Sequence, residues 1–118
     1  MFEDRETYAP LQLFEYDHKP GEYCLMLSDD RMLAVMDVFE ANERYGNGYA
    51  WADVALQAMR TRAPELEKRL DMDPEAGMFV AFGTDLEALK KLGELLRDAF
   101  HDRDTLAELV AKAPYEWD

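Results

Sequence analysis

Cysteine, serine and basic residues are scarce in this chain of 118 residues. The single cysteine, Cys24, excludes an intramolecular disulfide and any zinc site that needs paired cysteines. Ser28 is the only serine, and it stands where a helix is expected to begin, so capping already gives it a use. The two histidines do not form a helical pair with a neighbouring glutamate, which excludes a zincin. We therefore predict that the protein is not an enzyme and holds no cofactor or metal.

Long apolar runs are also missing. No run approaches the roughly 18 residues that a membrane helix needs, and the N-terminus is acidic where a secretory signal would be basic and then apolar. We expect a cytoplasmic protein without a membrane partner. With 13 Lys and Arg against 26 Asp and Glu, the net charge of −13 disfavours direct binding of nucleic acid. The charge favours a basic protein partner, although solubility alone is a sufficient reason for such an acidic surface.

The apolar pattern predicts one α+β domain over residues 1–118, in which about four helices pack on a small, mostly antiparallel sheet of about four strands. Two hairpins are expected, the first closed by a type II turn with Pro20 and Gly21 at its centre. Thr84 and Glu87 have the spacing of a capping box before the longest helix. The expected strands are Leu11–Asp17, Glu22–Ser28, Leu70–Asp73 and Gly77–Phe82, and the expected helices run from Ser28–Asp30 to about Arg44, over Trp51–Arg62, after Thr84, and over Asp104–Lys112.

The break between the first two expected helices is rich in glycine and aromatic residues. We expect Gly46 to take the left-handed conformation that ends a helix, and Asn47 or Gly48 to take another positive φ. Two interpretations of the rings remain open, because Trp51 at a helix start suits a core position while aromatic side chains are also typical of interface anchors. The candidate partner-binding residues in this loop are Tyr45, Asn47, Tyr49 and Trp51.

Asp71, Asp73 and Glu75 alternate as the ligands of a calcium loop do. The match fails, because Ala76 occupies the glycine position of such a loop and Phe82 the position of its bidentate acid. We therefore expect three exposed acids in a proline-containing turn, free of metal and available to a basic partner surface.

Two glycine-bearing segments, residues 46–51 and 73–79, together resemble the signature pair of the immunity protein 51 family. The resemblance extends from about Tyr16 to Ala113 and includes the Tyr-x-Leu-x-Leu pattern at Tyr23–Leu27. Members of that family are small bacterial proteins found beside polymorphic toxins. The resemblance implies that this protein binds and blocks a cognate toxin, for which a nuclease with a basic cleft is one candidate.

Two other functional classes remain open from sequence. The protein is alternatively an acidic interaction module or nucleic-acid mimic that occupies a basic surface of another protein, or a small enzyme that uses clustered carboxylates. The sequence leaves the toxin, the contact face and the oligomeric state undetermined.

Overall fold

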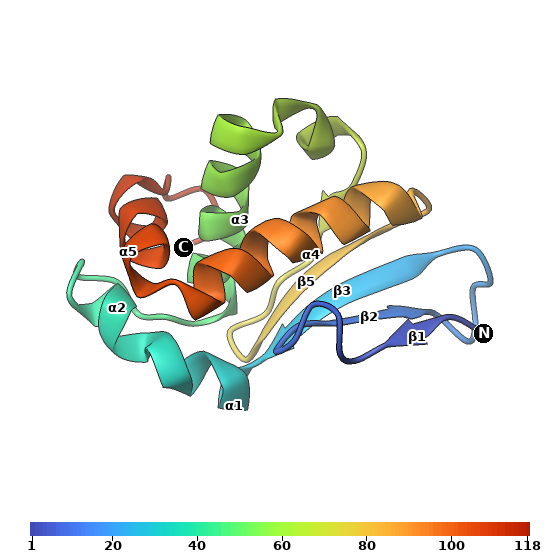
Figure 1. Cartoon of the computed structure of the whole chain (residues 1–118), viewed down its shortest axis with the longest axis horizontal. Coiled ribbons are helices and arrows are strands. Elements are labelled where there is room, and N and C mark those ends of the chain that lie inside the picture. Colours follow the sequence, from blue (N-terminus) through green and yellow to red (C-terminus); the bar gives the residue numbers. More distant parts are fainter.

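The structure, a computed structural model that describes residues 1–118, confirms the predicted α+β fold and adds a strand. Its sheet has five antiparallel strands in the order β1-β2-β3-β5-β4, with the helices gathered on one face (Figure 1). The additional strand is β1, at one edge of the sheet. The strands are β1 (Glu3–Asp4), β2 (Gln12–Glu15), β3 (Tyr23–Ser28), β4 (Asp71–Met72) and β5 (Met78–Gly83).

The turn between β2 and β3 has the predicted geometry. Gly21 has a φ of 89°, the value that the third residue of a type II turn requires, and proline precedes it. The amide of Glu22 donates to the carbonyl of Lys19 over 3.0 Å and closes the turn. The first hairpin is therefore confirmed.

Alternation along β3 separates a buried face of the sheet from a second face. Leu25 and Leu27 are fully buried beneath the helices, paired with Ala81 and Phe79 of β5. Cys24 points to the other face but is only 2% exposed, in keeping with the behaviour of a free cysteine as a small hydrophobic residue.

The first helical stretch is broken, whereas the sequence predicted one helix to about Arg44. It consists of α1 (Asp29–Met32), the 3-10 turn η1 (Leu33–Val35) and α2 (Met36–Glu40), because Val35 has a φ of −125° and interrupts the helical backbone. The left-handed residue after it is Glu43, with a φ of 60°. The predicted positive φ at Gly46, Asn47 or Gly48 is therefore wrong.

The remaining helices are α3 (Gly48–Arg62), the 3-10 helix η2 (Pro64–Lys68), α4 (Leu86–His101) and α5 (Arg103–Lys112). The predicted capping box at Thr84 is wrong by one residue. Asp85 caps α4 by accepting from the amide of Ala88 over 3.1 Å, and its carboxylate also binds Arg69 over 2.8 Å. These two donors hold the pKa of Asp85 below its ordinary range, with Arg69 as the larger cause.

Trp51 lies in the core between α3 and the neighbouring helices. Its side chain is fully buried, and its ring lies 5.3 Å from that of Phe39 and 6.2 Å from that of Phe100. The structure thus confirms the core interpretation of Trp51 and removes this residue from the candidate partner surface.

Candidate functional site

The two glycine-bearing segments, far apart in sequence, touch at the start of α3. The amide of Gly48 donates to the carbonyl of Ala76 over 2.9 Å. A Cβ at position 48 would overlap the carbonyl oxygens of Glu75 and Met78 and lie 2.7 Å from the carbonyl carbon of Met78. Glycine is therefore required here by the close approach of two backbones and not by its φ angle.

The predicted loop residues have different environments. The side chain of Tyr45 is 66% exposed, while Tyr49 is half-buried at the start of α3. Asn47 caps α3, since its side-chain oxygen accepts from the amide of Ala50 over 3.0 Å. Asn47 thus holds the loop in place, and Tyr45 is the ring of this loop most available to a partner.

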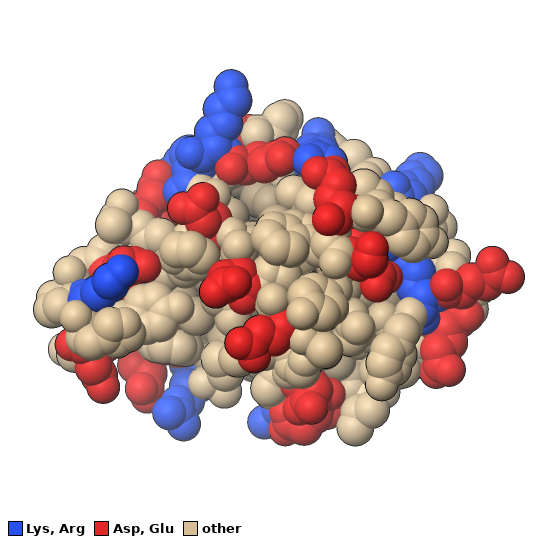
Figure 2. Space-filling view, turned by 180° about the vertical axis from the view of Figure 1, so that it is seen from behind, with Lys and Arg blue, Asp and Glu red and all other residues tan.

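All three acids predicted to be exposed are exposed, and none of them forms an ion pair. Asp71 lies in β4 opposite Phe82, while the amides of Asp73 and Glu75 bind the β5 carbonyls of Val80 and Met78. No three acid, histidine or cysteine side chains are arranged to hold a metal ion. Figure 2, seen from behind, shows acids among uncharged side chains across the middle of that face, with Lys and Arg toward its edge.

A groove of about 520 Å³ lies beside the joined segments, between α1 and α2 on one side and the loop before α3 on the other. It contains Tyr45 and Asn47 of the predicted residues, whereas Asp71, Asp73 and Glu75 lie outside it. The sequence did not indicate this groove, because Asp29 and Asp30 stand where a helix was expected to begin and showed no link to the Tyr45–Asn47 loop. Its lining residues are Asp29, Asp30, Met32, Leu33, Met36, Tyr45, Gly46, Asn47, Ala76 and Gly77.

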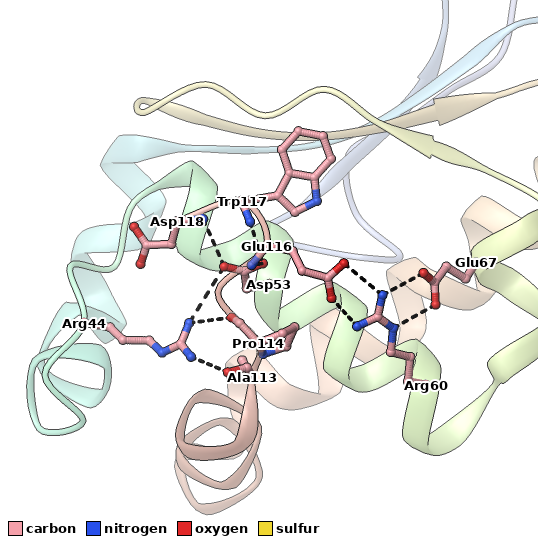
Figure 3. A network of polar contacts seen from close by, with 9 residues as sticks. All are labelled: Arg44, Asp53, Arg60, Glu67, Ala113, Pro114, Glu116, Trp117 and Asp118. Atoms are coloured by element: carbon pink, nitrogen blue, oxygen red, sulfur yellow. Dashed lines mark hydrogen bonds and ion pairs between the residues drawn. The ribbon is translucent and has the colours of Figure 1, made fainter.

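A second polar feature, also missed from sequence, fixes the C-terminal residues against α3 (Figure 3). Asp53 lies in the second turn of α3, and its side chain is fully buried. Its carboxylate accepts from the backbone amides of Glu116, Trp117 and Asp118 over 3.0 to 3.1 Å. A buried carboxylate requires such donors, because it has no water to solvate it.

Arg44 completes this network from the loop after α2. Its guanidinium lies 3.9 Å from the carboxylate of Asp53 and donates to the carbonyls of Ala113 and Pro114. Its central carbon also lies 3.7 Å from the centre of the Tyr115 ring, in cation–π geometry. Arg44 therefore ties the loop that presents Tyr45 to the C-terminal segment.

A more exposed cluster of ion pairs also holds the C-terminal segment against α3. Arg60 of α3 binds Glu67 of η2 over 2.9 Å and also binds Glu116 (Figure 3). The hydrogen bonds from Arg60 lower the pKa of both carboxyl groups. The C-terminal segment thus contacts the body of the protein at both ends of α3.

The comparison with protein families identifies the family of the chain. The family model described as Immunity protein 51 matches residues 11–114. The matched residues include the Gly48 loop, the Asp73–Gly77 turn and strands β2 to β5. The chain belongs to the immunity protein 51 family. No curated protein and no solved structure matches the chain.

Membership in the immunity protein 51 family assigns the chain to the non-enzymatic inhibitors and gives it a toxin as its partner. Both glycine-bearing segments lie within the matched residues, and the contact between Gly48 and the Glu75–Ala76 backbone joins them in the fold. No helix of the structure has the length and apolar character to cross a membrane.

Proposed function

We propose that this immunity protein binds one cognate bacterial toxin and blocks it with the surface formed by Tyr45, Tyr49 and the acids of the Asp71–Glu75 segment. The observation that supports the proposal most directly is the family match over residues 11–114, which contains all of these residues. The Gly48 contact gives the proposal its geometry, because it holds the aromatic loop against the Glu75–Ala76 end of the acid-bearing segment, while Asp71 lies further along the same segment, opposite Phe82.

The electrostatics of this surface favour a basic toxin. Asp71, Asp73 and Glu75 lack cationic partners within the protein, so their charge is available to a partner. The whole chain adds a net charge of −13, which accelerates encounter with a positive surface. A nuclease suits this description, because its basic cleft is also its active site and an acidic protein seated there excludes the substrate.

The rings of Tyr45, which is exposed, and Tyr49, which is half-buried, contribute to the affinity of the complex. Tyrosine brings a large contact area with few rotatable bonds and is enriched among the residues that dominate interface affinity. Tyr45 is held by a loop that Arg44 and Asn47 fix on either side, so little conformational entropy is lost when the ring is covered. Charge thus governs the rate of encounter, and the rings contribute to the lifetime of the complex.

The test is co-expression with the toxin domain encoded by the neighbouring gene. We expect growth arrest by the toxin domain to be relieved by this protein, and the two proteins to elute together from a sizing column. Growth arrest that persists while this protein is expressed in soluble form would contradict the proposal.

The alternative is an acidic module or nucleic-acid mimic that occupies a basic surface on a protein other than a toxin. The acidic composition is the observation in its favour. A duplex mimic places carboxylates in rows at phosphate-like spacing, whereas Figure 2 shows acids dispersed among uncharged side chains. Capture of a cellular nucleic-acid-binding protein, with no effect on the neighbouring toxin, would favour this alternative.

A further inference from the structure

We propose that the groove between α1–α2 and the Tyr45–Asn47 loop receives an arginine or lysine side chain of the toxin. This inference rests on the proposed function and assigns the groove's occupant. The groove measures about 520 Å³, enough for one long side chain and the turn of backbone that carries it. It lies beside the contact between the two segments, at the end of the molecule where α1 and α2 are drawn in Figure 1.

The charge of the groove selects a cation. Asp29 and Asp30 line it, and no lysine or arginine does. Asp30 already accepts a hydrogen bond from Ser28 and lies 3.8 Å from Arg31. Asp29 has no ion-pair partner, and its carboxylate lies beside Gly77, 3.5 Å from where a Cβ of that residue would stand, so it is the unmatched charge that a guanidinium or ammonium group can meet.

The apolar part of the lining suits the hydrocarbon stem of such a side chain. Leu33 and Tyr45 are 68% and 66% exposed, and both border the groove. Met32 lies buried beneath them. Arginine and lysine bury their methylene groups along surfaces of this kind, and the charged head gains from the face of a tyrosine ring.

A second copy of this chain is a poor occupant by comparison. Two copies each carry a net charge of −13 and repel one another, and the groove itself adds two carboxylates to that repulsion. A basic toxin surface brings the opposite charge to the same place. Charge complementarity therefore favours the toxin as the source of the side chain.

The experiment measures the dissociation constant for the neighbouring gene's toxin domain with two pairs of variants. Asp29→Lys is compared with Glu65→Lys, which makes the same change in net charge at an exposed acid of η2. Glu65 follows the far end of α3, a helix of 15 residues that spans about 22 Å. Tyr45→Ala is compared with Tyr45→Phe, which keeps the ring beside the groove and removes only its hydroxyl group. Melting temperatures establish that each variant is folded.

We expect Asp29→Lys to weaken binding by about tenfold or more relative to Glu65→Lys, and Tyr45→Ala by about tenfold or more relative to Tyr45→Phe. Equal dissociation constants within both pairs, for a wild-type protein that still neutralises the toxin, would overturn the groove assignment and remove Tyr45 from the proposed binding surface, while toxin neutralisation itself would stand. A wild-type protein that neither binds nor neutralises the toxin domain would overturn both.

Discussion

Replacing Gly48 by alanine adds one methyl group at the contact between the loop and the turn. The new Cβ would lie 2.7 Å from the carbonyl carbon of Met78, whereas carbon atoms in ordinary contact are about 3.5 to 4.0 Å apart. The obstructing atoms belong to backbone on both sides, so a side-chain rotation cannot relieve the overlap. The start of α3 and the Glu75–Gly77 turn must therefore separate by about 1 Å.

The free energy of unfolding should fall by about 1 to 3 kcal/mol. Overpacking of this kind costs about 1 to 3 kcal/mol, and separation also weakens the hydrogen bond from Gly48 to Ala76, worth about 1 kcal/mol. Alanine offsets at most about 1 kcal/mol of this through its better helix propensity. For a domain of this size, such a loss lowers the melting temperature by roughly 4 to 12 °C.

Gly77→Ala is the matched control, because it makes the same substitution in the same contact region. An added Cβ at Gly77 meets only the carboxylate of Asp29, at an ordinary distance of 3.5 Å. We expect its melting temperature to remain within a few degrees of wild type, since glycine-to-alanine changes without strain alter stability by about 1 kcal/mol or less. Equal melting temperatures for Gly48→Ala and Gly77→Ala, measured by differential scanning calorimetry, would refute the close-approach explanation.

The remaining predictions concern charged groups. Asp53→Ala should lower the free energy of unfolding by about 3 to 5 kcal/mol in urea titrations, because it leaves a buried guanidinium without its counter-charge; a loss below about 1 kcal/mol would contradict this. The folded-state pKa of Asp85 lies below its ordinary value of 3.8, so its stabilising contribution is complete above that value and is lost as the pH falls through the folded-state pKa. The difference in melting temperature between wild type and Asp85→Asn should therefore shrink on acidification, and a constant difference would contradict the assignment. The association rate with the toxin should fall steeply between low and high salt in stopped-flow measurements, since charges are screened over about 8 Å at physiological ionic strength; an unchanged rate would mean that the acidity serves solubility. Replacing Asp71, Asp73 and Glu75 together by their amides should leave the melting temperature nearly unchanged but slow association, because exposed unpaired charges contribute little to folding; a large loss of stability would show that they act within the fold.

Sequence patterns correctly predicted α4 and the first hairpin turn, which are specified by residues close together in the chain. The leucines at positions 86, 89, 92 and 96 recur at helical spacing, and they form the buried stripe of α4 except for the partly buried first one. Pro20 and Gly21 define their turn through their own backbone preferences. The strand β1 escaped prediction because its two acidic residues, Glu3 and Asp4, show no apolar alternation and are held in place only by pairing with β2.

The candidate site was predicted in part, for a related reason. The exposed positions of Tyr45 and the Asp71–Glu75 acids follow from residue type and turn chemistry. The groove does not, because Asp29 and Leu33 meet Tyr45 only after the helical stretch breaks at Val35 and the chain reverses. Pairings of this kind depend on tertiary geometry and leave no periodic signal in a single sequence.

The attachment of the C-terminal segment to Asp53 constrains the backbone of that segment more than its side chains. Asp53 binds residues 116, 117 and 118 through backbone amides, a group that every amino acid except proline carries. Side chains at these positions can therefore change without removing the three hydrogen bonds to Asp53, although a change at Glu116 also removes its contact with Arg60, whereas a proline at any of them deletes a donor. The segment is a place where the outer surface of the protein can diversify while the backbone beneath it stays fixed.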